Sequence, residues 1–88
     1  MWGSIISAAN KEDTMGKEII IFGKSSWPYT QKAREAKGQE GYKVDYRDVV
    51  DDPGHLEEML EFSQGVRKVP VLVEEGKGTV GYRGSWRV

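Results

Sequence analysis

A short apolar run followed by a proline constrains the fold of this chain more than any other feature. The run Ile19 to Phe22 is unbroken, which is typical of a strand buried on both faces, as in parallel pairing. Pro28 then opens a charged stretch, and proline suits a first helical turn because its missing N–H would have no intrahelical partner there. The sequence therefore predicts a strand over Glu18 to Gly23, a short loop, and a helix from Pro28 to about Gly38.

Trp27 stands at the N-terminus of that predicted helix. Free backbone N–H groups and the positive end of the helix dipole would stabilise a thiolate or selenolate at this place. Tryptophan cannot ionise, and the chain has no cysteine, which excludes disulfides and thiolate zinc sites. Because Trp27 precedes the helix in a loop, we expect its side chain on the surface or at the rim of a groove.

The middle of the chain predicts a second strand and a second helix. Tyr42 to Val49 alternates apolar and polar residues, which indicates a half-buried strand. Asp52 is a candidate N-cap, Pro53 takes the first helical position, and Gly65 is a plausible stop. The first helix is expected to bury a narrow face made of Tyr29, Ala33 and Ala36.

The last part of the chain predicts two more strands. Val69 to Val73 forms the third strand, although it contains Pro70, which is normally confined to edges, strand starts or bulges. Glu75 to Gly78 is expected to form a turn, and Thr79 to Tyr82 the last strand of a hairpin. The order strand–helix–strand–helix–strand–strand fits an α/β fold with a mixed sheet.

Three motifs carry a resemblance to a known family. Lys24-Ser25-Ser26-Trp27-Pro28-Tyr29-Thr30 resembles the Lys-x-x-Cys-Pro-Tyr-Cys signature of glutaredoxins with both cysteines replaced. Arg67-Lys68-Val69-Pro70 resembles the family's Arg-Thr-Val-Pro segment, and Gly84-Ser85 its Gly-Gly or Gly-Ser pair. Trp27-Pro28-Tyr29-Thr30 is also similar to the Sec-Pro-Tyr-Thr motif of a bacterial glutaredoxin-like selenoprotein group called Uxx-star, with Trp at the selenocysteine position.

The resemblance implies a thioredoxin-like, glutaredoxin-type three-layer fold with a four-stranded mixed sheet and flanking helices. It also implies a cis peptide bond before Pro70, facing the active site. We expect one domain over residues 17–88, behind a disordered N-terminal extension over residues 1–16. The family's C-terminal helix is expected to be missing, which would expose apolar sheet surface and favour a weak homodimer.

The resemblance further implies a glutathione-dependent (seleno)thiol–disulfide oxidoreductase. Trp27 would occupy the position of the nucleophile, and Thr30 that of the resolving cysteine, which a threonine cannot replace. Glutathione or a disulfide-containing protein would be the substrate. The implied glutathione-binding positions are Lys24, Tyr29, Arg67, Val69, Pro70, Gly84 and Ser85.

Two questions stay open at this point. With Trp27 the chain is expected to be redox-inactive, so the alternative is a redox-dead binding module for glutathione, a peptide or a protein partner. Trp86 follows Gly84-Ser85, where many glutaredoxins carry a second cysteine. It is therefore either a second replaced redox residue or an ordinary packing aromatic.

The charge and the hydropathy of the sequence disfavour two classes of partner, nucleic acids and membranes. The net charge of −1 and the dispersed basic residues do not favour nucleic acid, and no apolar run is long enough to cross a membrane. We expect a cytoplasmic protein. One histidine and scattered carboxylates do not predict a metal site, and the iron–sulfur cluster of some glutaredoxins needs an active-site thiolate.

Overall fold

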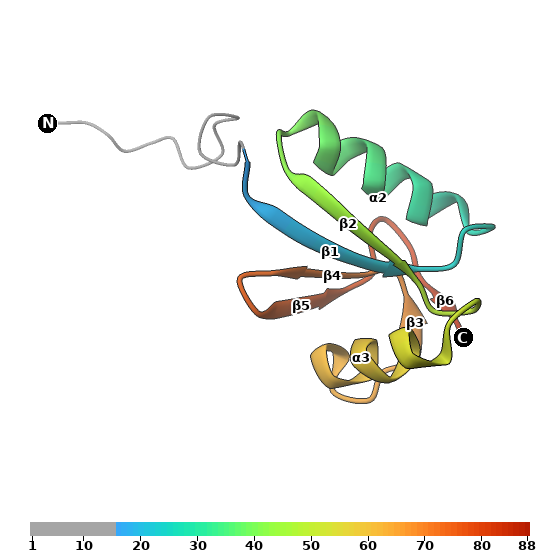
Figure 1. The fold of residues 1–88 in the computed structure, drawn as a ribbon. Coiled ribbons are helices and arrows are strands. Elements are labelled where there is room, and N and C mark those ends of the chain that lie inside the picture. The colour runs from blue at the N-terminus through green and yellow to red at the C-terminus, as the bar shows by residue number, and fades with distance from the viewer. Residues whose placement is uncertain (1–15) are drawn as a thin grey trace, which may run out of the picture.

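The computed structural model describes residues 16–88 (Figure 1). The extension predicted to be disordered lies outside the described residues, apart from Gly16, whose N–H donates to the Gly41 carbonyl at 2.9 Å. The elements are β1 (Glu18–Gly23), α2 (Pro28–Gln39), β2 (Lys43–Asp48), α3 (Pro53–Ser63), β3 (Lys68–Val69), β4 (Val71–Glu74), β5 (Lys77–Val80) and β6 (Trp86–Arg87).

Four strands form the main sheet, in the order β2-β1-β4-β5. β1 pairs parallel to β2 and antiparallel to β4, and β4 pairs antiparallel to β5. Helix α2 covers one face of the sheet and α3 the other, as Figure 1 shows. The predicted four-stranded mixed sheet between flanking helices is therefore confirmed.

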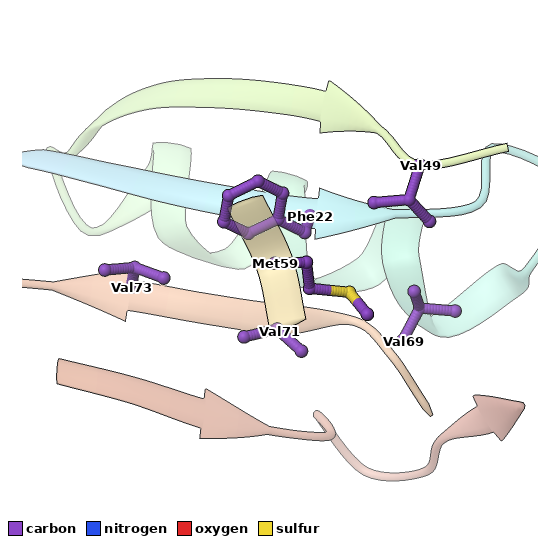
Figure 2. Packing of buried hydrophobic residues seen from close by; sticks show 6 residues of the cluster. All are labelled: Phe22, Val49, Met59, Val69, Val71 and Val73. Atoms are coloured by element: carbon purple, nitrogen blue, oxygen red, sulfur yellow. The ribbon is translucent and has the colours of Figure 1, made fainter. Parts of the chain in front are cut away.

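Alternate residues of β1 supply the two halves of the core. Phe22 faces α3 and packs in a cluster with Val71, Val73 and Met59 (Figure 2). Ile21 faces the opposite side, in a second cluster that includes Ala33 of α2. This period of two is the pleat of a strand that is buried on both faces.

Both helices start where the sequence predicts. Trp27 has an extended backbone and is followed by Pro28 at the first position of α2. At α3, the Asp52 side chain accepts a hydrogen bond from the Gly54 N–H at 2.9 Å, and Pro53 follows it. These starts are set by local chemistry, through the capping carboxylate of one helix and the fixed φ of proline in both.

Two predicted elements are wrong in detail. The third strand does not run through Pro70: it is divided into β3 and β4 at that residue, which has no N–H for a ladder, and the Val69–Pro70 bond is cis. The last hairpin strand begins at Lys77, not at Thr79, because Glu75 and Gly76 alone make the turn with positive φ values of 52° and 80°.

The strand β6 has no counterpart in the predicted order of elements. It pairs antiparallel with β3, so that Lys68 lies opposite Arg87 and Val69 opposite Trp86. In Figure 1 this small ribbon lies at the end of the sheet where β1 leads into α2. Among residues 16–88, no helix is long and apolar enough to cross a membrane.

Candidate active site at the start of helix α2

The loop between β1 and α2 is held by three backbone N–H groups. The Trp27 N–H donates to the Lys24 carbonyl at 2.9 Å, and the Thr30 N–H donates to the Trp27 carbonyl at 3.0 Å. The Ser25 N–H donates to the Asp48 carboxylate at the end of β2, at 3.3 Å. These bonds fix the position of residue 27 relative to both the helix and the neighbouring strand.

Asp48 acts as a local anchor for this end of the sheet. Its carboxylate accepts hydrogen bonds from the Val50 N–H at 2.8 Å, the Asp51 N–H at 2.9 Å and the Tyr46 hydroxyl at 2.9 Å. Burial raises the pKa of the Asp48 carboxyl, but these bonds and the one from Ser25 outweigh it, so that its pKa lies below the usual value.

The Trp27 side chain is more buried than the sequence suggests. It is half-buried and packs against the core cluster that contains Val69 and Met59, and its indole nitrogen is buried without a hydrogen-bond partner. Of the two places expected from the sequence, the surface or a rim, Trp27 takes the second, because it is half-buried and lines an open pocket. The apolar body of the ring gains burial, whereas the N–H loses its bond to water.

An aromatic cluster forms around Trp27. Its ring centroid lies 5.4 Å from that of Tyr29, in an edge-on arrangement, and 5.2 Å from that of Trp86. The Lys24 ammonium nitrogen lies 5.6 Å from the Trp86 ring centroid, within range of a cation–π contact. An open pocket of about 300 Å³ is lined by Lys24, Ser26, Trp27, Pro28 and Trp86.

Thr30 does not line this pocket. Its side chain is fully buried, and its hydroxyl has no hydrogen-bond partner. A Cβ atom placed on Gly23 would lie 2.5 Å from the Thr30 methyl carbon, so the missing side chain of Gly23 makes room for Thr30. The predicted buried face of α2 is corrected accordingly: Thr30 and Ala33 are its buried residues, whereas Tyr29 and Ala36 are only half-buried.

Residues of the Arg67–Pro70 motif and of the Gly84–Ser85 pair pack near Trp27 and Tyr29. Val69 and Pro70 are buried next to each other, and Val69 belongs to the cluster on which Trp27 packs. A Cβ atom on Gly84 would lie 2.9 Å from two carbons of the Tyr29 ring. The Tyr29 ring therefore packs directly on the Gly84 backbone, and a side chain at position 84 would have to displace the ring.

Arg67 and Ser85 do not line the pocket around Trp27. The Arg67 Nε donates to the Val88 backbone oxygen at 2.8 Å, and Arg67 lines a smaller pocket of about 160 Å³ together with Lys68 and Arg87. Ser85 is exposed. Of the nine predicted positions, Lys24 and Trp27 line the pocket, Tyr29 and Val69 pack near the Trp27 ring, and Gly84 lies against Tyr29.

A comparison with protein-family models decides the family. The model described as Glutaredoxin matches residues 19–78, which is well over half of the 88-residue chain. The chain belongs to the glutaredoxin family. Searches of curated proteins and of solved structures find no match. Glutaredoxins in general are thioredoxin-fold proteins that act with glutathione or protein disulfides, and the mixed sheet with its two helices fits that fold.

This glutaredoxin departs from the family at its reactive position. No residue of the chain is a cysteine, so the donor set for a cysteine-bound iron–sulfur cluster does not exist here. In residues 16–88, no group of three or more histidine, cysteine or acidic side chains is placed to hold a metal ion. His55 lies in α3, where its Nδ1 is 3.1 Å from the Asp48 carbonyl oxygen.

Sequence reasoning missed the part that residues 86–88 play in the site. Trp86 lines the pocket, whereas the sequence left open whether it is a second replaced redox residue or an ordinary packing aromatic. Val88 accepts from Arg67 and donates its N–H to the Arg67 carbonyl at 3.0 Å. The only signal in the sequence was an aromatic residue next to the Gly84-Ser85 pair.

Proposed function

We propose that this protein is a glutathione-linked thiol–disulfide oxidoreductase whose native reactive group at position 27 is selenocysteine or cysteine, and that it acts in the cytoplasm. The observation that carries the proposal is the place of residue 27. It is the N-cap of α2, and it packs on the cluster that contains Val69, the residue before cis-Pro70. A thiolate or selenolate there would be stabilised by the free N–H groups of the helix.

The poor fit of tryptophan supports this proposal. A buried N–H without an acceptor costs about 1–3 kcal/mol, and the Trp27 indole N–H is such a group. A cysteine or selenocysteine side chain carries no comparable donor and would leave the pocket wider. The site therefore suits a small, polarisable residue better than it suits an indole.

The chemistry that we propose for a thiolate at position 27 is a monothiol exchange. The thiolate attacks the glutathione sulfur of a mixed disulfide, so that a new S–S bond forms and the substrate leaves as a thiolate. A second glutathione thiolate then attacks the same glutathione sulfur and releases glutathione disulfide and the free thiolate at position 27. Thr30 takes no part in either step, because its side chain is fully buried and does not line the pocket.

Glutathione would lie along the pocket and the adjoining strand β3. Lys24 would pair with a glutathione carboxylate, and the Val69 backbone would pair with the extended tripeptide as a strand partner. Arg67, which lines the smaller pocket together with Lys68, would pair with the other glutathione carboxylate. As written, with Trp27, the chain has no group that attacks a disulfide.

One observation favours the second candidate function, a redox-dead binding module. Trp27 packs on the protein core and on two other aromatic rings, as an encoded tryptophan in a recognition site would. In that case the aromatic pocket itself would bind glutathione or a peptide, and Trp27→Ala would weaken the binding. The first candidate predicts instead that replacing Trp27 by a smaller nucleophile creates an activity.

The test is the gain of activity in Trp27→Cys. We expect glutathione-dependent reduction of a small mixed disulfide by this variant and none by the unmodified chain. Trp27→Ser relieves the same crowding without a thiol, and Ser26→Cys places a thiol in the exposed turn one residue before the helix cap. Both controls should stay inactive. Equal rates for Trp27→Cys and Ser26→Cys would show that the helix terminus is not an activating site and would refute the proposal.

A further inference from the structure

The backbone edge beside cis-Pro70 is already occupied by the chain itself. Strand β6 pairs antiparallel with β3, with Trp86 opposite Val69 and Arg87 opposite Lys68. This is the edge on which an extended ligand would pair in the proposed function. The segment Gly84 to Val88, here called the tail, therefore lies where the ligand backbone would lie.

The register shows that the tail and an extended ligand cannot pair with the Val69 backbone at the same time. The Val88 N–H donates to the Arg67 carbonyl at 3.0 Å, which makes Arg67 and Val88 a hydrogen-bonded pair of the ladder. Such pairs alternate along an antiparallel ladder, so the next one joins Val69 and Trp86. Both backbone groups of Val69 thus face Trp86 and are not available to another strand.

The tail also covers the groups around position 27. Trp86 lies against Trp27, with 5.2 Å between the ring centroids, and the Lys24 ammonium lies over the Trp86 ring. The Arg67 guanidinium is engaged as well, since its Nε donates to the Val88 backbone oxygen at 2.8 Å. Two of the cations that the proposed function assigns to glutathione carboxylates are therefore in contact with the tail.

We propose that the tail is an intramolecular competitor for the ligand site, and that glutathione binds only when β6 leaves β3. This inference rests on the proposed function, because it concerns the same site. The two hydrogen bonds between Arg67 and Val88 hold the tail in place whichever residue stands at position 27, and in the unmodified chain Trp86 also packs on Trp27. Release of the tail frees the Val69 backbone, the Lys24 ammonium and the Arg67 guanidinium in one event.

Few contacts of the tail are buried, so its separation from β3 should cost little free energy. β6 has two residues, both exposed, and 48% of the Trp86 surface remains accessible to solvent, so that Val88 is the one apolar side chain of the tail that is half-buried against the core. Segments with few buried contacts open more readily than the core does. The loop before the tail has positive φ values at Gly81 and Arg83, so it makes a sharp local turn that separates the tail from β5.

Val88→Pro is the most direct perturbation, because proline removes the N–H that donates to Arg67. Val88→Ala is its matched control, since it shortens the side chain and keeps that N–H. Trp86→Ala removes the ring that covers Trp27 and Lys24. The probe is reduced glutathione, titrated by calorimetry into the unmodified chain and each variant.

We expect Val88→Pro and Trp86→Ala to bind glutathione about three- to ten-fold more tightly than the unmodified chain, since the apparent affinity scales with the fraction of open molecules. The affinity of Val88→Ala should lie between that of the unmodified chain and that of Val88→Pro. In the unmodified chain at saturating glutathione, the Val88 amide should lose its protection from hydrogen exchange. This second measurement needs no variant and holds even if a variant folds poorly.

The outcomes separate the two proposals. If all chains bind glutathione equally and the Val88 amide stays protected in the complex, the tail is no competitor, and only this inference falls. If glutathione binds neither the unmodified chain nor the released variants, the glutathione function itself is wrong, and the inference falls with it. Weaker binding by Val88→Pro than by Val88→Ala would also overturn the inference, because the ladder bond would then support the ligand.

Discussion

Replacement of Thr30 by valine should stabilise this protein, although most core substitutions destabilise. Thr30 is fully buried in α2, and its hydroxyl has no hydrogen-bond partner. Its methyl carbon lies in the space left by Gly23. Valine has almost the same shape, so Thr30→Val keeps the methyl contact and puts a second methyl group where the unpaired hydroxyl lies.

The size of the effect follows from the unpaired hydroxyl. A buried polar group without a partner costs about 1–3 kcal/mol, and threonine and valine have similar helix propensities. We therefore expect the free energy of unfolding to rise by about 1 kcal/mol, which in a domain of this size raises the Tm by about 4–8 °C. Thr30→Ser keeps the hydroxyl and deletes the methyl group, and should lower the free energy of unfolding by about 1 kcal/mol.

Thermal and urea unfolding of the three chains, followed by circular dichroism, measure this difference. The reasoning requires the order Val, then Thr, then Ser in stability. If Thr30→Val is destabilised as much as Thr30→Ser, the hydroxyl makes a bond that stabilises the helix start. Threonine at position 30 would then be explained by that hydrogen bond, and not by packing against Gly23.

Two further predictions concern groups around the sheet. Asp48→Asn should lower the free energy of unfolding by about 1–2 kcal/mol through weaker bonds to the Ser25, Val50 and Asp51 N–H groups. Because the folded-state pKa of Asp48 is lowered, this gap should shrink as the pH falls through that pKa, and a gap that persists in acid would contradict it. The hydrogen bond from Tyr42 to Glu74, at 2.6 Å, raises the pKa of Tyr42 to about 12. The unmodified chain should lose stability from pH 10 to about 12, while only the unfolded state releases this proton, and Tyr42→Phe should lose less over that range; equal losses would refute the assignment.

The sequence predicts those parts of the fold that depend on local chemistry. Asp52 and Pro53 start α3 because a carboxylate caps the helix and proline fits its first turn. The unbroken apolar run predicts that β1 is buried on both faces, and the structure places its residues in two core clusters. The same reasoning places Trp27 at the start of α2.

The parts that could not be predicted depend on tertiary contacts. Thr30 is buried because Gly23 leaves space for its side chain, and the pattern of apolar and polar residues in α2 does not reveal that space. β6 is only two residues long, too short for any periodicity, and it exists because it pairs with β3. The contact between Trp27 and Trp86 joins residues that are far apart in the sequence, so the motifs identify the positions but not their stacking.

Sequencing the source gene at codon 27 tests the central claim most directly, with codon 2 as the internal reference. We predict TGA at position 27 and TGG at position 2, with a selenocysteine-insertion stem-loop just downstream of codon 27. TGG at both positions would contradict the claim, because Trp27 would then be an encoded tryptophan and the site a binding site only. TGA at both would also contradict it, since a genetic code that reads TGA as tryptophan would then account for Trp27.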